Sequence, residues 1–143
     1  MPSANQAVTQ KPAFPAEARF VEMVFPEHAN HYGTLFGGSA LALMAKAAVI
    51  AASRHARCSV VMGSADRIEF SAPVPVGQMI ELRAWVERTG RSSMTVIVDV
   101  TAETLSTGER KPAIRGAFEM IAVDPAGRPT PISARAAEET VSV

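Results

Sequence analysis

The sequence predicts an α+β fold in which one long central helix is wrapped by a curved antiparallel sheet of about five strands. Residues 39–56 contain only three ionisable side chains and many alanines, a composition typical of a buried helix. Residues 80–102 then alternate apolar and polar side chains with the period of two that a strand with one buried face shows. A helix followed by such strands indicates one helix packed on one sheet.

Turn signals divide the rest of the chain into further elements. Gly90 lies between two alternating runs and predicts a long antiparallel hairpin. Pro73 and Pro75 end the strand before it, because proline cannot donate a hydrogen bond to a sheet ladder. The expected strands are therefore residues 19–25, 59–70, 80–87, 94–102 and 111–123.

Composition indicates one globular domain that does not bind polyanions. The chain has 143 residues, of which 48% are hydrophobic, enough for a single core. Its 14 basic and 14 acidic residues are interspersed, so no charged surface for nucleic acid or an anionic membrane is expected. We expect a flexible N-terminal arm at residues 1–17, a single domain at 18–124 and a C-terminal tail at 125–143.

Cysteine usage and the N-terminal residues bear on location. Cys58 is the single cysteine, which excludes an intrachain disulfide and suits a reducing compartment. Residues 1–17 contain no apolar stretch of the kind found in signal peptides or membrane anchors. We therefore expect a cytoplasmic protein, with small molecules or other proteins as partners.

The candidate chemistry lies where a polar loop meets the helix. Residues 26–38 read PEHANHYGTLFGG and lead directly into the apolar helix. The first N–H groups of a helix have no intrahelical partner and lie at its positive end, so they polarise a carbonyl oxygen held there. Gly37 and Gly38 leave room for a substrate carbonyl to approach, which predicts an oxyanion site at these residues.

The three histidines indicate neither a metal site nor a clear base. His28 and His31 are three residues apart, but no third ligand lies at a usual spacing, so no metal is expected. His55 lies near the end of the helix, where a cation would meet the negative end of the dipole. We expect His55 to cap the helix.

The order of elements and motifs resembles the hotdog-fold acyl-CoA thioesterases, in particular the group of bacterial YciA and the mammalian cytosolic acyl-CoA hydrolases. The matching features cover about residues 18–123 and are Asn30 with Gly33, Gly37-Gly38, the helix, residues 66–70, residues 73–77 and Gly90-Arg91-Ser92-Ser93. The resemblance implies hydrolysis of acyl-CoA to a free acid and CoA. It also implies no metal or redox cofactor, since CoA is part of the substrate and the product.

The resemblance also implies a homo-oligomer with shared active sites. Two protomers pair edge to edge into a continuous sheet, and such dimers commonly assemble into trimers of dimers, which makes a hexamer. The asparagine of one chain's loop then faces an aspartate on the helix of the other chain. Asn30 matches the first of these catalytic positions. The alternative is a turn-former that satisfies its own backbone, but the context of the loop favours a functional role.

The second catalytic position is Ala45, the residue after Met44. Alanine can neither activate water nor attack a thioester, and loss of a positioned base typically slows a reaction about 10²- to 10⁴-fold. We expect this chain to be inactive or weakened. Three explanations stay open: an engineered replacement, a natural enzyme whose base has moved to Glu27, His28 or His31, and a natural acyl-CoA-binding protein without turnover.

By the same resemblance, Gly90, Arg91, Ser92 and Ser93 are the candidate CoA-binding residues. Their backbone turn, guanidinium and hydroxyls suit the amides and phosphates of CoA, although the residues alone indicate no more than a hairpin turn. A dehydratase built on the same fold would need an acidic residue on the helix. Residues 39–56 contain none, which disfavours that class.

Overall fold

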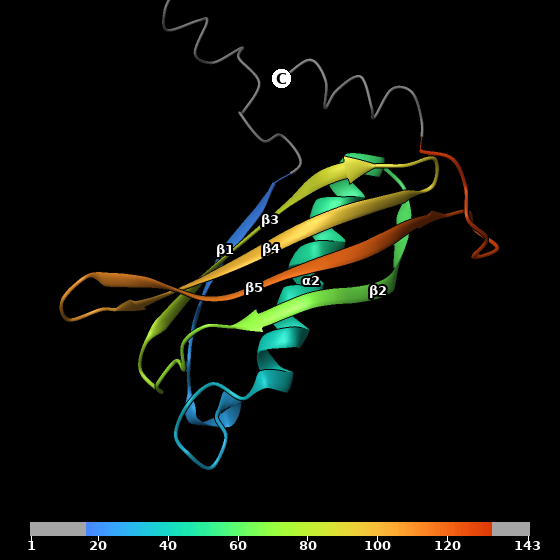
Figure 1. Ribbon diagram of the computed structural model, residues 1–143. Helices are drawn as coiled ribbons and strands as arrows, with labels where there is room; N and C mark the ends of the chain where they lie inside the picture. The colour runs from blue at the N-terminus through green and yellow to red at the C-terminus, as the bar shows by residue number, and fades with distance from the viewer. Residues whose placement is uncertain (1–16, 133–143) are drawn as a thin grey trace, which may run out of the picture.

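Five antiparallel strands and one long helix form the structure, a computed structural model that describes residues 17–132. The elements are β1 (Ala18–Met23), the 3-10 helix η1 (Pro26–His28), α2 (Gly37–Ala56), β2 (Ser59–Phe70), β3 (Met79–Thr89), β4 (Ser93–Thr104) and β5 (Glu109–Val123). The strands form one sheet in the order β1-β3-β4-β5-β2, with α2 lying across one of its faces (Figure 1). The predicted fold class is confirmed.

The core lies between α2 and the sheet. The helix contributes small side chains and one methionine, namely Ala40, Met44, Ala47, Ala48, Ala51 and Ala52. These positions recur every three or four residues, the spacing of one helix face. The helix begins at Gly37, two residues before the predicted start, so both glycines lie in its first turn. Within residues 17–132, no helix combines the length and the apolarity needed to cross a membrane.

Strands β3 and β4 form the predicted hairpin, and each has one face buried against the core, as predicted. On β3, Ile80, Leu82 and Ala84 are buried, while the residues between them are partly exposed. On β4, Met94, Val96, Val98, Val100 and Ala102 are buried in the same way, and Ile97 on the other face is buried as well. The alternation therefore places one face of each strand against α2, as the period of two requires.

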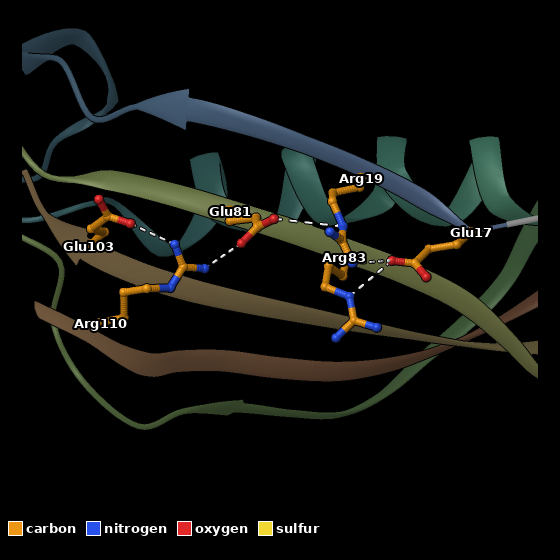
Figure 2. A network of polar contacts seen from close by, with 6 residues as sticks. All are labelled: Glu17, Arg19, Glu81, Arg83, Glu103 and Arg110. Atoms are coloured by element: carbon orange, nitrogen blue, oxygen red, sulfur yellow. Dashed lines mark hydrogen bonds and ion pairs between the residues drawn. The ribbon is translucent and has the colours of Figure 1, made fainter. Parts of the chain in front are cut away.

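The face of the sheet that points away from the helix carries a network of ion pairs (Figure 2). It is formed by Glu17, Arg19, Glu81, Arg83, Glu103 and Arg110. Glu17 Oε2 lies 2.9 Å from Arg83 Nε and 3.1 Å from Arg19 Nη2. Burial raises the pKa of Glu17, but the hydrogen bonds and charges of Arg83 and Arg19 outweigh it, so the net pKa is lowered.

The strand β2 lies at an edge of the sheet, beside β5, and is exposed along most of its length. Val61 and Met62 expose 48% and 41% of their surface. A bulge interrupts its pairing with β5 near Arg67, whose φ of 52° is left-handed and whose N–H donates to Asp66 Oδ1 at 2.9 Å. A long edge strand with apolar side chains is a surface on which another strand can pair.

Residues 124–132 fold back onto the sheet. Asp124 Oδ1 accepts hydrogen bonds from the N–H groups of Ala126 and Arg128, each at 2.9 Å. Thr130 then donates to the carbonyl of Ala122, and Ile132 packs against the core. The division of the chain at residue 124 stays a prediction, since residues 1–16 of the predicted arm and 133–143 of the predicted tail lie outside the described residues.

Candidate active site

Asn30 organises the loop that precedes α2. Its Oδ1 accepts hydrogen bonds from the N–H of Tyr32 at 3.0 Å, the N–H of Thr34 at 3.1 Å and the Oγ1 of Thr34 at 3.2 Å. Its N–H donates to the Thr34 carbonyl at 2.8 Å. A backbone N–H donates to an oxygen, so the atom that faces these two N–H groups is Oδ1. The amide nitrogen Nδ2 therefore points away from them and has no hydrogen-bond partner within residues 17–132. Asn30 is thus a turn-former that keeps two free donors.

The start of α2 presents unpaired backbone donors. The N–H of Phe36, the N-cap residue, donates to the His28 carbonyl at 2.8 Å. The first intrahelical bond runs from Ala40 to the Phe36 carbonyl at 3.0 Å, so the N–H groups of Gly37 and Gly38 lie ahead of the helical ladder. An oxygen held at this end of the helix is polarised by the amides and by the dipole.

Two aromatic rings flank these amides. A Cβ added to Gly38 would lie 2.6 Å from Cε2 of Phe36, and one added to Gly37 would lie 3.7 Å from Cζ of Phe70. Both rings are 54% exposed. The room that the glycines leave is therefore partly filled by aromatic side chains. Neither ring was assigned a role from the sequence, although Phe36 adjoins Gly37 and Phe70 belongs to the matching segment 66–70.

A pocket of about 280 Å³ adjoins the start of the helix. It is lined by Thr34, Leu35, Phe70, Ser71, Ala72, Pro73, Val74 and Ile114. Two of its wall residues connect it to the features described above. Thr34 is hydrogen-bonded to Asn30, and the ring of Phe70 lies against Gly37. A larger pocket of about 610 Å³ lies near the β2 bulge, with mainly charged walls and without a residue of the loop that precedes α2. The smaller pocket is therefore the candidate for binding an apolar ligand group.

Ala45 lies in the middle of α2, away from the loop. It follows Gly37 by eight residues, a rise of about 12 Å along the helix axis. Ala45 is half-buried, and the exposed residues Leu41, Lys46 and Val49 surround it on the part of α2 that the sheet does not cover. One protomer therefore does not bring Ala45 against Asn30.

The predicted CoA-binding residues form the β3–β4 turn. The N–H of Gly90 donates to the Ser93 carbonyl at 2.7 Å, and the carbonyls of Ser92 and Arg91 each accept a backbone hydrogen bond at 2.8 Å. This turn lies at the C-terminal end of α2 (Figure 1). The 20-residue helix spans about 30 Å, so one protomer does not bring this turn to Gly37.

The expected cationic cap at His55 is wrong. His55 is 3% exposed, and burial lowers its pKa, which favours the neutral imidazole. Its Nε2 shares a hydrogen bond with Thr89 Oγ1 at 2.9 Å, which ties the end of α2 to the end of β3. The helix ends instead at Arg57, in the left-handed region with φ 58°, whose N–H donates to the Ser53 carbonyl. The error arose because sequence position alone does not reveal burial.

The candidate replacement bases lie around the same loop. His28 has an enclosed Nδ1 that finds no hydrogen-bond partner among the described residues. His31 is exposed, with its ring centroid 4.0 Å from that of Tyr32. Glu27 is exposed on η1. Residues 17–132 contain no group of three His, Cys, Asp or Glu side chains placed to hold a metal ion.

A long helix on a five-strand antiparallel sheet of this order is the hotdog fold. Residues 32–109 match the model of the thioesterase superfamily. A relative from Bacillus subtilis, the uncharacterized acyl-CoA thioester hydrolase YkhA, is 36% identical over 126 residues, which cover 87% of this chain and 73% of the relative. The chain therefore belongs to the thioesterase superfamily.

Solved structures agree with this assignment. An acyl-CoA hydrolase from Staphylococcus aureus, in complex with butyryl-CoA and CoA, has a TM-score of 0.79 and 30% identity over 82% of this chain and 71% of that chain. Variants of that hydrolase with an asparagine or an aspartate changed to alanine have also been solved; these two positions are as far apart in sequence as Asn30 and Ala45. A hexameric thioesterase from Yersinia pestis has a TM-score of 0.76 and 31% identity over 80% of this chain and 93% of that chain.

Proposed function

We propose that this chain is an acyl-CoA thioesterase scaffold that lacks the family's catalytic carboxylate. The reaction of the complete site is hydrolysis of acyl-CoA to a free acid and CoA. The observation that carries the proposal is the unpaired amide pair at Gly37 and Gly38, next to a largely apolar pocket whose wall residue Phe70 lies against Gly37. Relatives named acyl-CoA thioester hydrolases support the substrate class.

The geometry suggests a role for each residue. The amides of Gly37 and Gly38 hold the thioester oxygen and stabilise the charge that develops when water attacks the carbonyl carbon. The free Nδ2 donors of Asn30 orient the thioester or the water. A carboxylate at position 45 would remove the proton of the attacking water, or attack directly, and CoA would leave as the thiolate. With Ala45 this last part is missing.

We propose that two protomers share each site. Ala45 lies about 12 Å along the axis from Gly37, so a loop and the middle of a helix meet only if they come from different chains. The exposed edge of β2 can pair with the same strand of a second copy and continue the sheet. A trimer of such dimers is the assembly that the hexameric Yersinia pestis relative supports.

The same arrangement explains how the β3–β4 turn can belong to the active site. Two-fold symmetry about β2 makes the two α2 helices antiparallel, so the C-terminal end of one helix approaches the N-terminal end of the other. The turn Gly90–Ser93 of one chain then lies toward the loop of its partner, where Arg91 and the serine hydroxyls bind the CoA portion.

We propose that the site hydrolyses the thioester with water and a carboxylate base, without a metal or redox cofactor, as the resemblance to the acyl-CoA thioesterases implies. We also propose a cytoplasmic location, which a free thiol such as that of Cys58 suits.

A second candidate function is binding of acyl-CoA without turnover. The absence of any carboxylate on α2 favours it, because a binding protein needs the amides and the pocket but no base. The two functions predict different results when a carboxylate is introduced.

The test measures thiol release from acyl-CoAs of increasing chain length. The parental chain is compared with Ala45→Asp and with Ala42→Asp, a matched control that places a carboxylate one turn earlier, at an exposed position of α2. We expect turnover to rise about 10²- to 10⁴-fold in Ala45→Asp alone. Enzyme-like rates in the parental chain would place the base elsewhere, with Glu27, His28 and His31 as the next substitutions. No turnover in any variant, with CoA esters still bound, would favour the binding protein.

A further inference from the structure

We infer that Phe70 limits the length of acyl chain that this site accepts, an inference that rests on the proposed thioesterase site. Phe70 is the last residue of β2, and its ring contributes to two surfaces at once. One is the start of α2, where the ring lies 3.7 Å from the place of a Gly37 Cβ. The other is the wall of the 280 Å³ pocket.

The ring of Phe70 lies near the place where the thioester would react. A thioester oxygen held by the Gly37 and Gly38 amides fixes the carbonyl carbon beside the start of the helix. The acyl chain begins at that carbon, and the ring of Phe70 both lies against Gly37 and forms part of the pocket wall. An acyl chain therefore passes along Phe70 as it enters the pocket.

Apart from Thr34 and Ser71, the other side chains of the pocket wall are apolar, and the wall is firmly held. Val74 and Ile114 are 2% and 4% exposed and belong to the core. The N–H of Leu35 donates to the Val74 carbonyl at 2.8 Å, and the N–H of Ser71 donates to the Ala113 carbonyl at 2.7 Å. These walls cannot move without disturbing the core or the backbone. Phe70, which is 54% exposed, is the large wall side chain that can change size while the fold stays intact.

The pocket volume indicates a short or medium chain. Ligand pockets usually enclose about 300–1,000 Å³, and 280 Å³ lies just below that range. Each methylene buried in an apolar pocket strengthens binding about fourfold. Affinity is therefore expected to rise with chain length until the pocket is full and then to level off. The chain length at which it levels off reports the size of the pocket.

The experiment measures dissociation constants by titration calorimetry for CoA and for a series of acyl-CoAs from acetyl to dodecanoyl, in steps of two carbons. The proteins are the parental chain, Phe70→Ala and Phe70→Trp. Val21→Ala is the matched control, because Val21 is also exposed but lies on β1, at the opposite edge of the sheet. We expect the levelling point to move at least two carbons longer in Phe70→Ala and shorter in Phe70→Trp, with no change in Val21→Ala.

Three results would overturn the inference while leaving the proposed function intact. They are a levelling point that stays the same in both Phe70 variants, an affinity for CoA esters that does not depend on chain length, and a Phe70→Ala protein whose mass in light scattering falls below that of the parental assembly. The last result would make Phe70 a contact between protomers. If the parental chain bound neither CoA nor any acyl-CoA, the proposed function itself would fail.

Discussion

Asn30 and Thr34 are joined by three hydrogen bonds that close the loop ahead of α2. The side-chain oxygen of Asn30 accepts from both the N–H and the hydroxyl of Thr34, and the Asn30 N–H donates to the Thr34 carbonyl. Thr34 also lines the candidate acyl pocket. Asn30 is proposed to orient the reactants, and through Thr34 it also shapes the pocket wall. Substitutions must therefore separate these two roles.

The substitutions Asn30→Asp and Asn30→Ala separate the two roles of Asn30. Aspartate keeps the oxygen that accepts the loop hydrogen bonds but lacks the Nδ2 donors, so the unfolding free energy is expected to stay close to parental. Alanine leaves the N–H groups of Tyr32 and Thr34 without that acceptor, which is expected to cost about 1–2 kcal/mol. Urea unfolding measures both values. Acyl-CoA affinity is expected to fall in both variants; parental affinity in Asn30→Asp would show that Nδ2 does not contact the ligand.

His55 makes stability depend on pH near neutrality. Burial lowers its folded pKa below the ordinary value of 6.5, so the unfolded chain binds a proton more readily. The free energy of unfolding is therefore expected to fall as the pH drops below about 6.5. Urea midpoints between pH 5 and 8 measure this slope for the parental chain, for His55→Gln and for His31→Gln, an exposed control. An equal slope in all three would contradict the assignment to His55.

Glu17 makes stability depend on pH in a more acidic range than His55 does. Its folded pKa lies below 4.5 because its bonds to Arg83 and Arg19 outweigh the effect of burial, so its stabilisation is present above pH 4.5 and is lost as the pH falls through the folded pKa. Thermal midpoints below pH 4.5 are expected to fall more steeply in the parental chain than in Glu17→Gln. Glu27→Gln, outside the network, is the control and is expected to behave like the parental chain.

The edge strand β2 is expected to hold the dimer together. In Val61→Glu, two-fold pairing would bring like charges close together, so the assembly is expected to dissociate at micromolar concentration. Val21→Glu places the same charge at a comparably exposed position on β1, the opposite edge. Light scattering measures both masses. An intact assembly in Val61→Glu, or dissociation in Val21→Glu alone, would exclude pairing through β2.

Much of the fold was predictable because periodicity is local. The alternation around Ile80 and Met94 and the apolar run through Ala48 each reflect one element packed on one core, and all three were found in the structure. Burial of His55 was not predictable, because it depends on Thr89 and on the way the end of β3 lies over the helix. Contacts between distant segments leave no periodic trace in the sequence.

The candidate site shows the same division. Asn30, Gly37 and Gly38 could be proposed from the sequence because they lie in one continuous stretch beside the helix. Phe70 was missed because the chain brings β2 back to the start of α2 from another part of the sequence. Gly90 follows Thr89, which is hydrogen-bonded to His55 near the C-terminal end of α2, so it lies far from Gly37, a separation that a linear motif cannot reveal.

The most direct test of the proposed shared, incomplete site mixes two proteins that are each expected to be inactive. The parental chain supplies Asn30 but no carboxylate, and the double variant Ala45→Asp, Asn30→Ala supplies the carboxylate but no asparagine. Unfolded together and refolded, they form hybrid assemblies in which one chain's Asn30 faces the other chain's new carboxylate. Thiol release from acyl-CoA is expected in the mixture and in Ala45→Asp, but in neither partner alone. An active Ala45→Asp protein with a mixture no more active than its two components would contradict a site shared between protomers.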